Sequence, residues 1–130
     1  MPWVRFADDY LSNPKVQSLG LAARVLDFSA IIYSARELRD GKLTRTDVEL
    51  VANLTRMRRW RAAADELVAH GRWVVCEHPV LYLIHDYLSY QPSRETVLAQ
   101  REELHSVRAE AGRQGGLAKA RNGRNGLANG

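Results

Sequence analysis

The sequence predicts an α+β fold, a mainly α-helical domain that carries a small β-hairpin. Apolar residues recur at helical spacing over most of the chain and alternate only in short runs. The 130 residues, of which 45% are hydrophobic, suffice for one globular domain with a core. Asp40-Gly41 and Gly71 follow periodic segments, and these residue types favour turns.

The first third of the chain reads as a short strand, a turn and a long helix. Residues 3–6 alternate apolar and polar side chains, which predicts an edge strand, and Asn13-Pro14 opens a short helical turn. The long helix is expected over residues 21–38. Its expected buried face is an apolar row with three neighbours that widen it: Leu21, Val25, Phe28, Ile32 and Ala35, with Leu26, Ala30 and Tyr33.

Two shorter helices are expected next, after a strand at Lys42-Leu43. Thr44 and Asp47 have the spacing of a capping box before a helix over residues 47–54. Thr55 can cap the following helix, over residues 56–70, which Gly71 ends. The inward side chains expected for the two helices are Val48, Leu50, Val51 and Leu54, then Met57, Trp60, Ala64, Leu67 and Val68.

The start of this third helix is the basic part of the domain. Arg58 and Arg59 fall on its outward face, and Arg56 and Arg61 flank them. Like charges clustered at the positive end of a helix dipole cost stability, which favours a functional role over a merely solvated face. Recognition helices contact base edges from this end.

A hairpin and a last helix complete the expected fold. Residues 73–76 and 80–85 predict two strands joined at residues 77–79, and Ser93 can cap a helix over residues 94–111. The whole pattern is that of a winged helix-turn-helix followed by a C-terminal helix. The expected parts are a winged domain over residues 1–92, the helix over 93–111, and a flexible basic tail, rich in Gly and Asn, over 112–130.

Charge placement predicts a polyanionic partner. The net charge is +4, and the tail with Arg113, Lys119, Arg121 and Arg124 contains no acid. Local basic clusters on a neutral body are typical of nucleic-acid binding. The alternative is a solvated face with a solubilising tail.

Other classes of function find little support in the sequence. Cys76, His78, His85 and His70 have no compact zinc-ligand spacing, and no third group orients a Cys–His nucleophilic pair. No phosphate-binding loop is present, and no apolar run approaches the roughly 18 residues of a membrane span. We therefore expect no enzyme activity, no metal and no cofactor, and a cytoplasmic protein.

Several motifs resemble one family. Asp8-Asp9-Tyr10, Asn13-Pro14-Lys15-Val16, the segment from Leu67 to Gly71, and the block from Ile84 through Ser93 look like small phage proteins from actinobacterial hosts. Those proteins are similar to the N-terminal winged-helix domain of phage replication initiators and replisome organisers. The resemblance covers residues 3–121 and implies a DNA-binding protein that acts in replication initiation or transcription regulation. The longer replisome organisers carry a further C-terminal domain, in place of which we expect a basic tail here.

We expect double-stranded DNA to contact three parts of the chain. Arg58 and Arg59 are the expected base-edge contacts. The expected phosphate contacts are Arg45, Thr55, Arg56 and Arg61, then Arg72 and His78 near the hairpin. The wing around His78 and the tail, with Arg113, Lys119, Arg121 and Arg124, are expected to add backbone or minor-groove contacts. A module that recruits or inhibits a host protein is the alternative. The weak apolar row Val97, Leu104, Val107 and Ala111 allows a homodimer.

Overall fold

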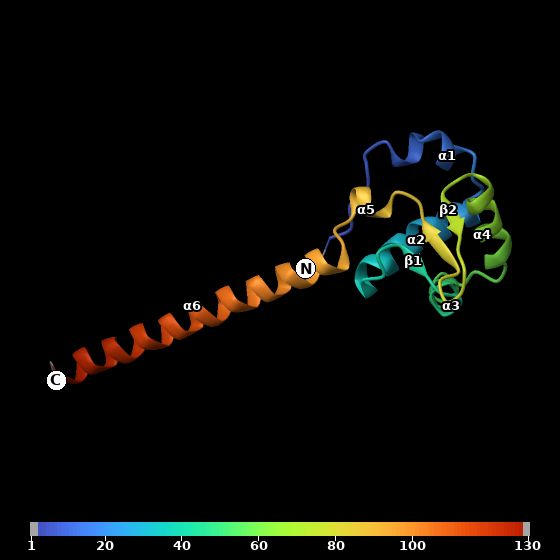
Figure 1. The fold of residues 1–130 in the computed structure, drawn as a ribbon. Helices are drawn as coiled ribbons and strands as arrows, with labels where there is room; N and C mark the ends of the chain where they lie inside the picture. Colours follow the sequence, from blue (N-terminus) through green and yellow to red (C-terminus); the bar gives the residue numbers. More distant parts are fainter. Residues whose placement is uncertain (1–2, 129–130) are drawn as a thin grey trace. The chain divides into compact units, whose positions relative to one another are not determined.

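The computed structural model describes the backbone of residues 3–128 and the side chains of residues 3–121. The chain forms two units, which divide between Arg94 and Glu95. It is mostly helical, with one small three-stranded antiparallel sheet, which confirms the α+β expectation. Figure 1 shows the elements in chain order. No helix within residues 3–128 is long and apolar enough to cross a membrane.

The first unit holds all three strands and every helix but the last. A 3-10 turn, η1, precedes the short helix α1 and the long helix α2; β1, α3 and α4 follow, and the hairpin β2–β3 and a short helix α5 end the unit (Figure 1). The bounds are η1 Tyr10–Ser12, α1 Pro14–Gln17, α2 Leu21–Glu37, β1 Lys42–Leu43, α3 Arg45–Leu54, α4 Trp60–Ala69, β2 Trp73–Val75, β3 Tyr82–Ile84 and α5 Tyr87–Tyr90.

The sheet has the order β1-β3-β2, so the expected strand at Lys42 does join the hairpin. Leu43 pairs with Tyr82, and Trp73 pairs with Ile84 across the hairpin. Leu43, Tyr82, Trp73 and Ile84 are all buried, because alternate residues of these strands face the helices. The sheet therefore closes one side of the core.

The buried face of α2 is only partly the expected one. Leu21 is 79% exposed and Ile32 41% exposed, whereas Leu26 and Ala30, which were expected only to widen the row, are fully buried. The buried row also contains Asp27 and Ser34. These side chains are polar, so the hydrophobic pattern of the sequence predicts that they are exposed. The small side chain of Ala30 and the hydrogen-bonded Asp27 allow this face to approach the core closely. The helix therefore keeps an apolar row exposed.

The capping box before α3 is confirmed. The Thr44 hydroxyl accepts the Asp47 N–H at 3.2 Å, and the Asp47 carboxylate accepts the Thr44 N–H at 2.9 Å. Val48 and Val51 are buried as expected, but Leu50 and Leu54 are 45% and 76% exposed. In the next helix Leu67 and Ala64 are buried, and Met57, Trp60 and Val68 pack against the core from partly buried positions.

The expected N-terminal edge strand is wrong. Residues 3–6 form no strand, although the segment is held to the unit by Gln91. The Gln91 side chain accepts the Arg5 N–H at 3.0 Å, and its amide donates to the Arg5 carbonyl. A single buried amide side chain therefore supplies the two hydrogen bonds that a neighbouring strand would have given.

The second unit is a single helix. Helix α6 spans Arg94–Ala128, so it runs past residue 111, where the sequence predicted that it would end and a flexible tail begin. Its backbone continues through Gly112, Gly115 and Gly116, where a Cβ would meet nothing within 4 Å. Each described side chain from Leu98 to Arg121 is exposed.

Candidate nucleic-acid interface

The connection between α3 and α4 carries three of the four clustered arginines. Helix α4 begins at Trp60, so the expectation that Arg56, Arg58 and Arg59 lie on a helix is wrong. Arg56 and Arg58 lie in the connection, and Arg59 is the residue that precedes the first turn.

The reason is the way in which α3 ends. The Met57 N–H donates to the Ala52 carbonyl at 2.8 Å, and the Arg56 N–H donates to the Asn53 carbonyl at 3.1 Å. Arg56 has a φ of 55°. This is the Schellman arrangement, which usually places glycine at the left-handed position. The chain is thereby turned so that Met57 packs on the core and the arginines on either side face solvent.

Thr55 ends α3 and does not cap α4. Its hydroxyl donates to the carbonyls of Val51, at 2.9 Å, and Ala52, at 3.2 Å. The N-terminus of α4 has no side-chain cap. The N–H groups that no helical partner satisfies at such an end attract anions.

The four arginines of this region are exposed and form no ion pair with the described residues. The guanidinium of Arg61 lies 5.4 Å from the centre of the Trp60 ring. Some other exposed arginines of the unit are paired, as Arg36 is with Glu37 and Arg45 with Glu49 at 2.8 Å. The cluster over residues 56–61, which we call the arginine turn, is thus a concentration of uncompensated positive charge.

An open hollow adjoins the arginine turn. It is lined by the outer side of α3 and by the connection: Glu49, Ala52, Asn53, Arg56, Met57, Arg58 and Trp60. Asn53 is exposed, and its amide can both donate to and accept from a polar ligand. The sequence reading missed Asn53. Its place just before the end of α3 was the only signal that could have indicated it.

Arg72 does not belong to this surface. Its side chain is 12% exposed and is paired with the buried carboxylate of Asp27 at 3.0 Å. The Tyr10 hydroxyl and the Trp73 indole N–H donate to the same carboxylate at 2.6 and 3.0 Å. Burial, and then the Asp27 charge, raise the pKa of Tyr10 well above its usual value. The expected phosphate contact at Arg72 is therefore replaced by a structural ion pair.

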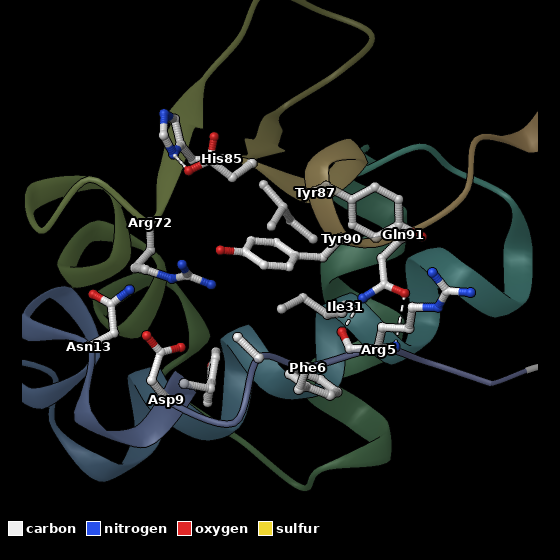
Figure 2. Close-up of a pocket in the computed structure, with 14 residues that line it drawn as sticks. Arg5, Phe6, Asp9, Asn13, Ile31, Arg72, His85, Tyr87, Tyr90 and Gln91 are labelled. Atoms are coloured by element: carbon white, nitrogen blue, oxygen red, sulfur yellow. Dashed lines mark hydrogen bonds and ion pairs between the residues drawn. The ribbon is translucent and has the colours of Figure 1, made fainter.

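A small cavity of about 50 Å³ lies beside this ion pair. Figure 2 shows Arg72 and the Tyr90 ring pointing into it, with Asp9 and Asn13 along one side. The motifs quoted above for the family resemblance supply much of its lining: Asp9, Tyr10, Asn13, Ile84, His85, Asp86, Tyr87, Tyr90 and Gln91. Within the described residues, no buried side-chain nitrogen or oxygen lacks a partner. The hydrogen bonds of Arg5 with Gln91 and of Tyr10 with Asp27 hold the N-terminal segment against the rest of the unit.

The remaining expected contacts belong to elements other than the arginine turn. His78 is exposed in the loop between β2 and β3. Arg113, Lys119 and Arg121 are exposed on α6 in the second unit, where Arg113 pairs with Glu110. The side chain of Arg124 lies outside the described residues.

Comparisons of the chain with protein-family models, with curated proteins and with solved structures found no match.

Proposed function

We propose that the first unit is a winged helix-turn-helix domain that binds double-stranded DNA. The order of its elements supports this proposal: α2, β1, α3 and α4 precede the hairpin, and β1 pairs with β3 as the third strand. In such domains the second helix of the pair enters the major groove with its N-terminal residues toward the bases. Here that helix is α4.

The arginine turn is the observation that carries the proposal. Four exposed guanidiniums that no acid neutralises stand at the N-terminus of α4. Their mutual repulsion, and their position at the positive end of the helix dipole, both oppose folding. A phosphate backbone would relieve both costs, because it brings negative charge to the same place.

The positions of the arginines assign their roles differently from the sequence reading. Arg56, Arg58 and Arg59 precede α4, where they would contact phosphates at the edge of the groove. Arg61 lies in the first turn of α4 and is exposed, as is its small neighbour Ala62. Arg61 is therefore our candidate for base contact, and a guanidinium matches the two acceptors of guanine. Asp65, one turn further on, is also exposed.

Titration of labelled duplex DNA tests the proposal directly. We expect the wild-type affinity to fall steeply with salt, and we expect Arg58→Ala and Arg59→Ala each to reduce the salt slope by about one. Arg36→Ala is the matched control, because Arg36 is exposed on α2 far from the arginine turn in sequence. An affinity that ignores both salt and the arginine turn would refute DNA binding by this surface.

The biological role proposed is in phage DNA replication initiation or transcription regulation, within the bacterial cytoplasm. It rests on the resemblance of residues 3–121 to small phage proteins. We propose no enzyme activity. Selection of duplexes from a random pool, followed by mapping of the selected site onto the genome that encodes the chain, would distinguish an origin from a promoter.

A protein partner is the second candidate function, and the exposed face of α2 favours it. Leu21, Val25, Phe28 and Ile32 form an apolar row along this helix, from 38% to 79% exposed. Beside the row, a hollow lined by Ile32, Tyr33, Val51, Leu54 and four others separates α2 from α3. Exposed apolar surface of this extent is typical of protein interaction sites. Binding that ignores salt and is lost in Leu21→Asp would support this candidate.

A further inference from the structure

Helix α6 presents one weak apolar edge along its first half. Val97, Leu104 and Ala111 are spaced by seven residues, and Val107 and Gln100 fill the intervening inward positions. Leu104 is 49% exposed and Val107 59% exposed. A long helix with exposed side chains draws little stability from its own hydrogen bonds. The seven-residue spacing matches the seam of a two-stranded coiled coil.

The charges that flank this edge have a particular spacing. Glu103 and Arg108 lie five residues apart on opposite sides of the seam, and both are exposed. Side chains five apart do not meet within one helix, where neighbours are three or four apart. Neither residue forms an ion pair with the described residues. Five is the spacing at which charges attract between two parallel helices of a coiled coil.

We propose that α6 binds a second copy of this chain as a parallel, in-register coiled coil over residues 97–111, held in register by Glu103 and the partner's Arg108. The two-fold symmetry of the dimer gives two such ion pairs, one on each side of the seam. Gln100 supports the same register, since it would face the partner's Gln100 and the two amides can hydrogen-bond.

The same charges oppose the antiparallel alternative. In an antiparallel pair, residues on the same side of the seam face each other, so Glu103 would face an acid and Arg108 a base. An antiparallel seam centred between Leu104 and Val107 would also place Gln100 against Ala111 and leave the amide unsatisfied. A second copy in parallel orientation is therefore the occupant that fits this edge.

Charge exchange in the full-length chain tests the pairing. We expect Glu103→Arg or Arg108→Glu alone to weaken the dimer about tenfold, because two attractive pairs become repulsive. The double variant E103R/R108E should restore the wild-type dissociation constant, and so should a mixture of the two single variants, which would form a heterodimer. Sedimentation over a range of concentrations measures all of these. Glu102→Arg, outside the seam, is the control.

The orientation has its own test, and its readout does not involve DNA. In a Cys76→Ala background and with oxidised glutathione as the oxidant, Val97→Cys should form an intermolecular disulfide, because parallel helices bring the two copies of residue 97 together. In an antiparallel seam centred between Leu104 and Val107 they would lie about 25 Å apart along the helix axis. A chain that stays monomeric at millimolar concentration, a dimer indifferent to the exchanges, or a failure to cross-link would each overturn the proposal. DNA binding by the first unit would be untouched by that outcome.

Discussion

Asp27 and Arg72, 45 residues apart in the chain, form a buried ion pair. The Arg72 Nη2 and Nε atoms lie 3.0 and 3.2 Å from the same carboxylate oxygen, Oδ2 of Asp27. The Asp27 side chain is fully buried, and Tyr10 and Trp73 donate to it as well. One carboxylate therefore joins α2, the segment before the hairpin, and the N-terminal turn.

Asp27→Asn should destabilise the first unit by about 3–5 kcal/mol, because it leaves the largely buried Arg72 guanidinium without a counter-charge. Denaturation in urea, followed by tryptophan fluorescence, measures the free energy of unfolding. The control is Glu49→Gln, which removes the exposed pair with Arg45 and should cost less than about 1 kcal/mol. Equal losses in the two variants would show that the buried pair does not hold the elements together.

Asp47 should make stability depend on acid pH. Burial alone would raise the pKa of Asp47, but hydrogen bonds from Tyr33 and Thr44, with the Arg39 charge, hold that pKa below its ordinary value of 3.8. A lowered folded pKa contributes stability above the unfolded pKa, and the contribution is lost as pH falls through the folded pKa. We expect Asp47→Asn to flatten the loss of stability below about pH 4.

The measurement is the free energy of unfolding at a series of pH values from 7 down to 2. Asp8→Asn is the matched control, since Asp8 is exposed and lies outside the capping box. A pH profile that Asp47→Asn leaves as steep as the control would contradict this assignment.

Gly41→Ala should destabilise the unit by about 1–3 kcal/mol, for two reasons. Gly41 has a φ of 79°, and an added Cβ would lie 2.7 Å from the Tyr87 Cβ. Tyr87→Ala cannot rescue the variant, because alanine keeps that Cβ. Gly112→Ala is the control, since a Cβ there meets nothing within 4 Å and alanine favours a helix by up to about 1 kcal/mol. The melting temperature of the first unit should fall in Gly41→Ala and stay the same in Gly112→Ala, because Gly112 lies in the second unit.

The two faces of α2 allow the same substitution to be compared. Leu26→Ala should cost about 2–5 kcal/mol, because Leu26 is fully buried. Leu21→Ala should cost less than about 0.5 kcal/mol, because Leu21 is 79% exposed. Chemical denaturation of both variants checks the assignment. The opposite ranking would mean that the expected row Leu21, Val25, Phe28 and Ile32 is the buried one.

Local chemistry explains which elements could be predicted from the sequence. Thr44 and Asp47 satisfy each other within one turn, so the start of α3 depends on nothing distant. The hairpin and its partner strand at Lys42-Leu43 are bounded by turn residues, and they too were found. The face of α2 could not be found in this way, because the helix is apolar on both sides. Its buried side is the one with Asp27, whose partner Arg72 is distant in the chain.

The arginine turn shows a second feature that could not be predicted from the sequence, namely where α3 ends and α4 begins. Helix α3 ends at a left-handed residue, and the usual signal for such an end is glycine. Arg56 occupies that position, so the periodic pattern runs on without an apparent break and the next helix was expected to start four residues too early. The arginines were recognised as candidates, but their distribution between connection and helix required the structure.

This position offers a last prediction. An arginine with a φ of 55° is strained, so Arg56→Gly should stabilise the fold by about 0.5–1 kcal/mol. The same change removes a guanidinium from the proposed phosphate contacts, so it should weaken DNA binding and lower the salt slope by about one. Strain that persists at such a position is typical of functional sites.

Two measurements on one variant therefore separate the possibilities, namely the free energy of unfolding and the affinity for duplex DNA. Arg58→Gly is the control: Arg58 has no positive φ, so glycine there should weaken binding without raising stability. Greater stability with unchanged affinity would mean that Arg56 only ends α3 and does not contact DNA. A fall in both would mean that the left-handed arginine is not strained. Greater stability with weaker binding is the result expected if the residue is kept at this turn for its contact with DNA.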